Sequence, residues 1–434
     1  MRIGIIGTGY VGMVTAVCLS EMGHEVIGTD VVPDKIQKAS QGIAHIYEPG
    51  LEDLLKKGLK RGNLSFSVDL SGTIQNSDVL FVCVNTPPKK DGSADMSFVE
   101  DVSRTIAENL NSYKVIVEKS TVPVQTSMWI KRIISLYKKT DQEFDVASNP
   151  EFLREGAAVS DFQNPDRIII GVETDKARDI LLKLYENYSD KILVTNIDTA
   201  ELIKHASNSF LALKISYINL IADLCEKTDA DVELIAKGMG LDTRIGPKFL
   251  NAGLGYGGSC FPKDARALIH IGEELGVNFD CLKEVEKINT NRIHVFVDKI
   301  KKALWILKDK KIAVLGLAFK PETDDLRNAP SIRVIEELHK EGAFLRLYDP
   351  KAMDNMKSFF PEKKPDIQYV SSLYEAVEGA NALLLITEWD EFAQMDLNKV
   401  KSLMANPIFI DGRNVFNPED VRKIGFEYSS IGRK

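Results

Sequence analysis

Short apolar runs and longer amphipathic segments alternate along the N-terminal part of the chain. Buried strands are predicted at residues 2–6, 25–29, 79–84 and 115–118. Helical spacing separates them, over residues 13–22, 51–59 and 98–110. This order of strands and helices predicts an α/β domain with a parallel sheet, which we place at residues 1–196.

The C-terminal part repeats this pattern. Strands are predicted at residues 311–316, 344–348 and 382–386, and a helix at 331–341. Gly316-Leu317-Ala318-Phe319-Lys320 stands where a dinucleotide turn would need further glycines. We therefore expect a second Rossmann-like domain, residues 298–434, that holds a mononucleotide instead of a second NAD, with Lys320 and Arg327 near its anionic groups.

A long helix is predicted between these two domains, because no glycine or proline interrupts residues 199–228. At 1.5 Å per residue it would be about 45 Å long, with Asp198 and Glu201 as a capping box at its start. Its apolar residues point to nearly all sides, which predicts a covering partner subunit and hence a homodimer. Residues 197–297 form this central helical domain, and residues 298–307, with Trp305, a helical linker.

Composition limits the classes of function. The chain has 434 residues and a formal net charge of -8, which favours small-molecule ligands over nucleic acid or anionic membranes. Five scattered cysteines without a C-x-x-C pair argue against a disulfide framework and against a zinc site. Without a signal-like N-terminus or a long apolar run, we expect a cytoplasmic protein.

A dinucleotide-binding motif follows the first strand at once. Gly7, Gly9 and Gly12 form G-x-G-x-x-G with Tyr10 and Val11 between them, and a helix follows. The glycines allow a tight turn, close approach of a pyrophosphate and packing of the helix on the strand. Asp30 ends the second strand, where a carboxylate binds an adenosine ribose and repels a 2′-phosphate. The sequence therefore predicts an NAD site.

Polar turns follow three later strands. They are Asn85-Thr86-Pro87-Pro88, Ser120-Thr121-Val122-Pro123 and the loop from Ala147 to Gly156, which carries two carboxylates and an arginine. Open α/β sheets bind ligands at the carboxyl ends of their strands, so these turns are candidate ligand contacts. Ordinary proline-stopped turns would explain the first two equally well.

The strongest candidate for chemistry is Cys260, in Gly257-Gly258-Ser259-Cys260-Phe261-Pro262-Lys263-Asp264. A helix is predicted after it, so the cysteine lies just before a helix N-terminus, where a thiolate is favoured. A buried structural cysteine is the alternative. On the long helix, Lys204 and Asn208 are spaced i, i+4 and so share a face, although a solvated lysine and a helical asparagine would show the same spacing.

Taken together, these motifs resemble the UDP-glucose and GDP-mannose dehydrogenase family over essentially the whole chain. The resemblance rests on the glycine turn with Asp30, the turns at 85–87, 120–123 and 149–153, the pair Lys204 and Asn208, and the loop at 257–264. Residues 244–250 are most similar to the branch that oxidises UDP-glucose. Dehydrogenases of GDP-mannose or UDP-N-acetylmannosamine, and a non-catalytic NAD-sensing module, are the alternatives.

The resemblance implies oxidation of a nucleotide-sugar CH₂OH to a carboxylate, with two NAD in succession and no metal. Cys260 would hold the aldehyde as a thiohemiacetal and then a thioester. Lys204 and Asn208 would stabilise charge on the sugar oxygen, Asp264 and Thr121 would position or activate water, and Glu151 would accept a proton.

The resemblance also implies binding residues. Contacts to NAD, beside the glycine turn, are expected from Tyr10, Val11, Asp30, Lys35, Thr86, Thr121, Glu155, Lys263 and Arg327. Contacts to the nucleotide sugar are expected from Glu151, Phe152, Leu153, Arg154, Glu155, Lys204, Asn208, Phe249, Leu250, Asn251, Ala252, Gly253, Gly257 and Lys320. Arg244 is expected to reach the site of the neighbouring subunit.

Overall fold

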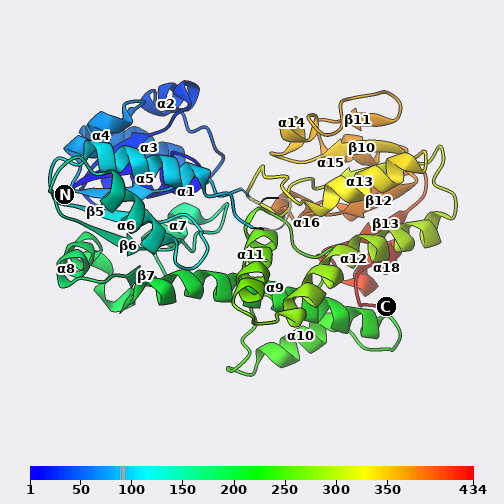
Figure 1. Cartoon of the computed structure of the whole chain (residues 1–434). Coiled ribbons are helices and arrows are strands. Elements are labelled where there is room, and N and C mark those ends of the chain that lie inside the picture. Colours follow the sequence, from blue (N-terminus) through cyan, green and yellow to red (C-terminus); the bar gives the residue numbers. More distant parts are fainter. Residues whose placement is uncertain (88, 90–92) are drawn as a thin grey trace. The chain divides into compact units, whose positions relative to one another are not determined.

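The computed structural model describes residues 1–87, 89 and 93–434, so Pro88 of the predicted turn at 85–88 lies outside the described residues. The chain divides into two compact units (Figure 1). The first contains residues 1–207 and 266–277, and the second contains residues 208–265 and 278–434. The division falls inside helix α9 (Ile197–Cys225). The predicted domain limits at 196 and 297 stay predictions.

The first unit is built on one sheet with the strand order β3-β2-β1-β4-β5-β6-β7-β8 among the described residues. Its strands are β1 (Arg2–Ile6), β2 (Glu25–Thr29), β3 (Leu64–Ser67), β4 (Val79–Val82), β5 (Lys114–Glu118), β6 (Phe144–Ser148), β7 (Ile168–Gly171) and β8 (Ile192–Thr195). The pairs are parallel except β6 with β7. The order reverses between β1 and β4, which is where Rossmann-type sheets bind dinucleotides.

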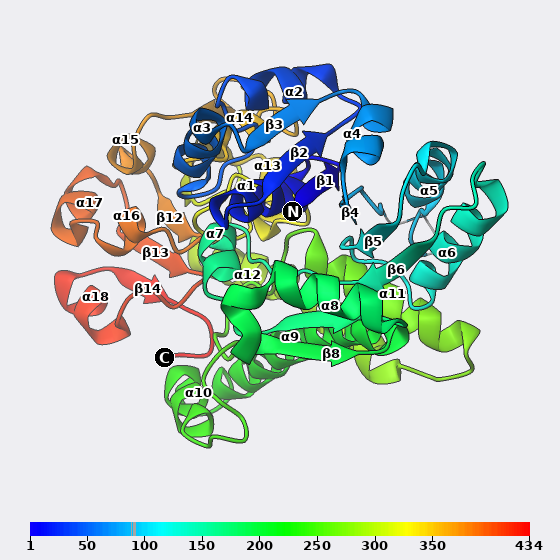
Figure 2. The ribbon, with the colours of Figure 1, turned by 90° about the vertical axis from the view of Figure 1, so that its left-hand side faces the viewer.

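Helices cover both faces of this sheet. They are α1 (Tyr10–Glu21), α2 (Pro33–Ser40), α3 (Leu51–Arg61), α4 (Leu70–Asn76), α5 (Ser97–Asn109), α6 (Thr126–Tyr137), α7 (Ala158–Gln163) and α8 (Asp175–Leu184). Side chains alternate along each strand, so Ile5 packs with α1 and α3 while Ile6 packs with α4, α5 and α6. Figure 2 shows α5 and α6 together on their side of the sheet.

The second unit has its own parallel sheet, with the strand order β11-β10-β9-β12-β13-β14 among the described residues. Its strands are β9 (Lys311–Leu315), β10 (Phe344–Tyr348), β11 (Ile367–Tyr369), β12 (Ala382–Leu385), β13 (Ile408–Asp411) and β14 (Glu427–Ser429). This order matches that of the first six strands of the other sheet. The predicted α/β class with two Rossmann-like sheets and a long helix between them in sequence is confirmed.

Helices of the second unit include the C-terminal part of α9 and the first residues of α11 (Cys260–Glu274). The others are α10 (Val232–Gly240), α12 (Asp280–Leu304), α13 (Pro330–Lys340), α14 (Met353–Met356), α15 (Leu373–Val377), α16 (Asp390–Ala393), α17 (Leu397–Leu403) and α18 (Pro418–Ile424). Ile218 of α9 and Phe296 of α12 share one apolar core with the sheet strands. The central helices and the C-terminal sheet therefore pack as one body.

Three helix predictions need correction. Helix α9 ends at Cys225 instead of 228, and its start is capped by Asn196, whose Oδ1 accepts a hydrogen bond from Thr199 N at 2.8 Å. Glu201 does not take part in a capping box, because its carboxylate binds another helix. Residues 298–307 are not a separate linker: residues 298–304 are the last turns of α12, and Trp305 is its C-cap.

Helix α11 (Cys260–Glu274) begins at Cys260, so this cysteine is the first residue of the helix instead of preceding it. In the part of the chain that the structure describes, no helix is both long and apolar enough to cross a membrane.

Candidate active site

The turn from β1 to α1 leaves room for a ligand at one glycine only. Gly7 has φ +92°, and a Cβ there would lie 2.6 Å from the Cys83 carbonyl oxygen. A Cβ on Gly12 would lie 1.8 Å from the Gly7 oxygen, whereas the atom nearest to one on Gly9 is Asn85 Oδ1, at 4.0 Å. Open space at the second glycine, beside the N-terminus of α1, fits the pyrophosphate of NAD.

Asp30 is buried at the end of β2 and holds this turn. Its carboxylate accepts hydrogen bonds from Thr8 N at 2.9 Å, Thr8 Oγ1 at 3.1 Å and Val32 N at 3.0 Å. Lys35 Nζ lies 3.6 Å away. Burial works to raise its pKa, but the hydrogen bonds and Lys35 outweigh burial and leave the pKa below its usual value. Asp30 is therefore an anion where a ribose would bind.

Tyr10, in the same turn, is tied to the segment that follows the predicted sugar loop. Its hydroxyl donates to the carboxylate of Glu48. Glu48 also accepts hydrogen bonds from Gly156 N and Ala158 N, both at 2.7 Å. Sequence reasoning missed Glu48, although a carboxylate ahead of Pro49-Gly50 is a signal of a turn. One buried acid thus connects the glycine turn with the start of α7.

Two of the predicted polar turns meet. Thr86 Oγ1 donates to the Thr121 carbonyl oxygen at 2.9 Å. The carbonyl oxygen of the next residue, Val122, lies 2.7 Å from Nε2 of His205 on α9. The ends of β4 and β5 are therefore linked to each other and to the long helix.

Lys204 and Glu151 form a buried ion pair. Lys204 Nζ lies 2.7 Å from both Glu151 Oε1 and the Glu151 carbonyl oxygen. The same ammonium lies 5.3 Å from the ring centroid of Phe152, which Arg167 also covers at 3.7 Å. The structure thus rules out the solvated lysine that the sequence left open. A cation held by a carboxylate and a carbonyl is suited to bind a further oxygen atom.

Two further buried charged residues, Glu118 and Lys119 at the end of β5, were missed by sequence reasoning. Lys119 Nζ donates to Asn149 Oδ1 at 3.0 Å, and Tyr185 donates to the same oxygen at 2.7 Å. Burial lowers the pKa of Lys119 to about 8 and raises that of the neighbouring Glu118 to about 8. Charged residues at the end of an apolar strand were the available signal, because burying them is costly.

The second unit carries the cysteine loop, which is held on several sides. Tyr256 N donates to Asn289 Oδ1 at 2.8 Å, and Gly258 N donates to the Arg327 carbonyl oxygen at 2.8 Å. Gly258 has φ +80°, and a Cβ there would lie 2.9 Å from the Phe319 ring. Cys260 follows, partly buried, with its Sγ 3.6 Å from Ser259 Oγ. Its backbone is therefore fixed at the N-terminus of α11, where a thiolate is favoured.

Two of the predicted catalytic residues meet next to this loop. Asn208 Nδ2 of α9 donates to Asp264 Oδ2 at 2.6 Å, and both side chains are buried. Lys263 Nζ lies 3.4 Å from Asp264 Oδ1. The interaction orients the amide of Asn208, one helical turn after Lys204 on the same helix.

The remaining candidates differ in setting. Phe249 has φ +65° and lies 6.1 Å from the Phe261 ring, while Leu250 and Ala252 are core residues. Gly253 N donates to Asn219 Oδ1 at 2.9 Å. Val11 lies in α1, and Leu153 N donates to Glu151 Oε2 at 2.6 Å. Asn251 is exposed.

Three predicted arginines form ion pairs near the surface of their units. Arg154 pairs with Asp161 at 2.6 Å, Arg327 with Asp325 at 2.8 Å, and Arg244 with Asp242 at 2.5 Å. Lys320 lies 5.6 Å from the Phe319 ring centroid. The predicted site residues are divided between the two units. The first unit contains Thr86, Thr121, Glu151 to Glu155 and Lys204, and the second contains Asn208, Cys260, Lys263, Asp264 and Lys320.

Within the second unit, sequence reasoning missed the residues that support the cysteine loop from behind. Arg292 is fully buried in α12 and donates to the Gly253 carbonyl oxygen at 3.3 Å. Arg413 donates to the Phe319 carbonyl oxygen at 3.1 Å and to that of Gly255 at 3.4 Å. An arginine on an otherwise apolar helix face was the signal for Arg292, whereas Arg413 lies 158 residues from Gly255 in the sequence and gave none.

A Rossmann sheet with an open glycine turn and a buried acid at the end of its second strand is typical of NAD-dependent dehydrogenases, and the comparisons with known proteins agree. Three protein-family models match: the NAD binding domain at residues 1–189, the central domain at 198–291 and the UDP binding domain at 313–418. All three describe one family. The chain belongs to the UDP-glucose/GDP-mannose dehydrogenase family.

Individual relatives match over the whole of this chain. UDP-glucose 6-dehydrogenase TuaD of Bacillus subtilis is 44% identical to it, with 93% of the relative covered. A UDP-glucose 6-dehydrogenase of Rhizobium meliloti is also 44% identical, with 100% of the relative covered. A UDP-glucose dehydrogenase structure from Pyrobaculum islandicum superposes with a TM-score of 0.93 at 36% identity, covering 100% of this chain and 98% of the other. A UDP-D-ManNAc dehydrogenase structure from Pyrococcus horikoshii superposes with a TM-score of 0.86 at 28% identity, covering 100% of this chain and 99% of the other.

Proposed function

We propose that this protein is a UDP-glucose 6-dehydrogenase, which oxidises UDP-glucose to UDP-glucuronate with two NAD. The observation that carries the substrate is the identity of 44% over the full chain with UDP-glucose 6-dehydrogenases from two organisms. The UDP-D-ManNAc dehydrogenase is 28% identical. The specificity for NAD is supported by the buried, ionised Asp30 at the end of β2.

Cys260 explains how a primary alcohol can lose two hydrides. The first oxidation removes a hydride and a proton from the CH₂OH group and leaves an aldehyde. The Cys260 thiolate then adds to the aldehyde carbon, and the new oxyanion takes up a proton to give a thiohemiacetal. Loss of a second hydride and a proton gives the thioester, and water cleaves the C–S bond to release the carboxylate and the thiol. When bound, NAD accepts each hydride in turn.

Lys204 and Asn208 are proposed to stabilise the sugar oxygen as it gains negative charge. Both side chains are buried and oriented, Lys204 by Glu151 and Asn208 by Asp264. Fixed donors in a buried site need no reorganisation when the charge develops. Glu151, bonded to Lys204, is the proposed proton acceptor.

Asp264 and Thr121 are proposed to position the water that cleaves the thioester. Asp264 keeps one carboxylate oxygen bonded to Asn208, so its other oxygen, 3.4 Å from Lys263 Nζ, is the one available to orient water. The predicted binding residues for NAD and the nucleotide sugar keep the roles that the resemblance gives them. Action in the cytoplasm stays a prediction.

A homodimer is also proposed. Phe210, Tyr217 and Leu224 are spaced by seven residues on α9 and are 59%, 49% and 63% exposed. Such a stripe on a helix is typical of a face that a second helix covers. Arg244 follows α10, and its side chain is 87% exposed and pairs with Asp242. It is proposed to extend towards a partner subunit's site.

The test is the number of NADH molecules formed for each sugar. Purified protein is given limiting UDP-glucose, GDP-mannose and UDP-N-acetylmannosamine separately, NADH is counted, and the product is identified by mass. We expect two NADH and one uronate from UDP-glucose. Cys260→Ser should slow the second oxidation by about 10⁴-fold or more, because serine is a far weaker nucleophile. The exposed Cys281→Ser is the matched control and should still give two NADH.

Each alternative has its own outcome. One NADH for each sugar with free aldehyde released would reject the cysteine mechanism. Turnover of another sugar in place of UDP-glucose would keep the mechanism and overturn the substrate. No NADH from any of the three would favour an NAD-sensing module.

A further inference from the structure

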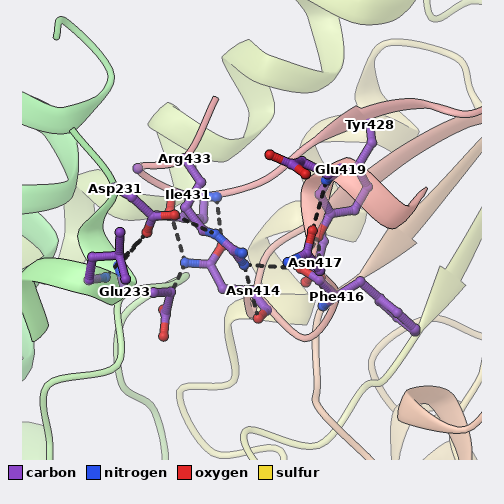
Figure 3. Close-up of polar contacts among 12 residues, drawn as sticks. Asp231, Glu233, Asn414, Phe416, Asn417, Glu419, Tyr428, Ile431 and Arg433 are labelled. Carbon is purple, nitrogen blue, oxygen red and sulfur yellow. Dashed lines mark hydrogen bonds and ion pairs between the residues drawn. The ribbon is translucent and has the colours of Figure 1, made fainter. Parts of the chain in front are cut away.

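Asn414 is held in an unusual backbone conformation by its side chain. It follows β13 within Asp411-Gly412-Arg413-Asn414 and has φ 58°, in the left-handed region that asparagine tolerates better than most residues. Its amide donates to the Ile431 carbonyl oxygen at 2.8 Å and to Glu233 Oε1 at 3.2 Å (Figure 3). Its Oδ1 accepts a hydrogen bond from Ile431 N at 2.9 Å.

The segment that Asn414 binds, residues 431–433, is itself fixed on the central helices. Gly432 N donates to Glu226 Oε1 at 2.8 Å, and Val232 N donates to the Gly432 oxygen at 3.0 Å. A Cβ on Gly432 would lie 2.7 Å from the Cβ of Ala222 on α9. Arg433 donates to the Phe416 oxygen at 3.0 Å, and its Nε lies 3.6 Å from Asp231 (Figure 3). The segment therefore acts as a fixed support for Asn414.

The residue before Asn414 extends to the cysteine loop. Arg413 Nε donates to the Ile386 carbonyl oxygen at 2.7 Å, and its terminal nitrogens reach the Phe319 and Gly255 oxygens. Phe319 packs against the positions of Gly257 and Gly258, where an added Cβ would lie 2.9 Å from it. The Gly412 oxygen lies 2.9 Å from the Cβ position of Gly253. Residues 412 and 413 thus contact Gly253 and Gly255 directly, and Arg413 is connected to Gly257 and Gly258 through Phe319.

We propose that Asn414 is a positioning residue for nucleotide-sugar binding. By bonding Ile431 and Glu233, its amide sets the turn at 411–414, and the turn directs Arg413 to the carbonyl groups of the cysteine loop. The inference rests on the proposed function in so far as this loop binds a nucleotide sugar. All contacts involved lie in the second unit, whereas the glycine turn and Asp30 lie in the first. An effect on the sugar should therefore leave binding of NAD unchanged.

The test compares Asn414→Gly with Asn417→Ala. Glycine accepts the left-handed backbone, so Asn414→Gly removes the amide alone. Asn417 is a matched control, because its side chain caps α18 through Glu419 N and Asp420 N and does not bond Ile431 or Glu233 in the structure described here. We expect Asn414→Gly to raise KM for UDP-glucose by about tenfold, the size of one lost hydrogen bond, with KM for NAD unchanged. Asn417→Ala should lower the melting temperature with both KM values unchanged.

Alkylation of Cys260 gives a second readout that does not need turnover. A loosened loop should react faster with iodoacetamide in Asn414→Gly than in Asn417→Ala, measured by mass spectrometry at that peptide. If the unaltered protein oxidises no nucleotide sugar, the proposed function fails and this rate alone decides the role of Asn414. Equal alkylation rates, or equal changes in both KM values, would overturn the proposal.

Should Asn414→Gly not fold, Glu233→Ala takes its place. It removes one of the three hydrogen bonds from a partly exposed position in the first turn of α10. The same shift in KM for UDP-glucose is expected, at smaller size, and no shift would count against the proposal.

Discussion

Single residues in the first unit show how a buried charge is stabilised by local hydrogen bonds. Asp30 is 8% exposed, and its carboxylate accepts hydrogen bonds from the backbone N–H groups of Thr8 and Val32. A carboxylate with several donors stays ionised even when buried. Asp30 both holds the Gly7-Thr8 turn and presents negative charge, so we propose that one side chain binds the adenosine ribose and rejects a 2′-phosphate.

This gives a prediction on cofactor choice. Asp30→Ala should lower kcat/KM for NAD and narrow the gap between NAD and NADP, because the ribose loses its acceptor and a 2′-phosphate loses its repulsion. Steady-state kinetics with both cofactors would measure this. Asp30→Asn keeps an acceptor for Thr8 N and should retain more activity with NAD. Comparable kcat/KM for both cofactors in the unaltered protein would contradict the prediction.

At the same scale, the sequence predicts residues better than their partners. Gly7, Gly9, Gly12 and Asp30 are readable because their spacing along one strand–turn–helix unit fixes their geometry. The partner of Lys204 cannot be predicted in this way, since Glu151 lies 53 residues earlier and only the fold brings the two together. For the same reason Arg413 could not be connected with Gly255, which is 158 residues away.

Elements differ in how well their limits can be read. Strands β1, β2 and β10 begin and end where apolar runs meet glycine or polar turns, as predicted. Helix α12 was read only near its end, because polar residues interrupt its apolar face and the fully buried Arg292 lies on that face. For α9 the capping residue was predicted wrongly, because Glu201 makes a contact with another helix that the local sequence does not reveal.

That contact joins α9 to α6. Glu201 Oε1 accepts hydrogen bonds from Ser127 N at 3.0 Å and Ser127 Oγ at 2.7 Å, and Oε2 accepts one from Gln125 N at 2.6 Å. These are the donors at the N-terminus of α6, so a side chain of one helix caps another. Lys204 and His205, on the same face of α9, bind the ends of β6 and β5. The first turns of α9 therefore hold the ends of two strands and the start of α6 together.

Glu201→Gln should lower the melting temperature by roughly 2 to 4 °C, the effect expected for loss of about 1 kcal/mol of helix capping in a unit of this size. Burial raises the pKa of Glu201 above its ordinary 4.5. The folded state therefore favours the protonated acid, and the wild-type protein loses stability as the pH rises above about 4.5, whereas glutamine does not titrate. The deficit of the variant should thus shrink as the pH increases.

Asp198→Asn is the control, because Asp198 lies exposed in the first turn of α9 and was the partner in the capping box that the sequence suggested. Thermal unfolding followed by circular dichroism at pH 5, 6 and 7 would measure both variants. A larger loss for Asp198→Asn than for Glu201→Gln would contradict the capping role described for Glu201.

For the molecule as a whole, one group of exposed apolar residues lies on the central helices. Beside the stripe of Phe210, Tyr217 and Leu224 on α9, it includes Leu234 of α10 and its C-cap Leu241, which are 68% and 78% exposed. On the opposite side of α9, Ala212, Ile218 and Ala222 are fully buried. The all-round apolar pattern in the sequence thus has two parts: one side of α9 packs on the core, and the other is exposed, where we propose that a second copy of the chain binds.

The last prediction tests that second copy. Tyr217→Glu places a charge in the middle of the stripe, where burial against an apolar partner would cost several kcal/mol unless the charge is paired. We expect the unaltered protein to be a dimer by light scattering at micromolar concentration and Tyr217→Glu to be a monomer or insoluble. Leu136→Glu is the matched control, since Leu136 is 68% exposed on α6 of the first unit and is not part of the stripe, and its replacement should leave the dimer intact. If Arg244 reaches a partner's site, the Tyr217→Glu monomer should also lose activity with UDP-glucose while it still binds NAD, whose predicted glycine turn and Asp30 lie within the first unit. A monomeric unaltered protein with full activity would contradict both the dimer and the role of Arg244.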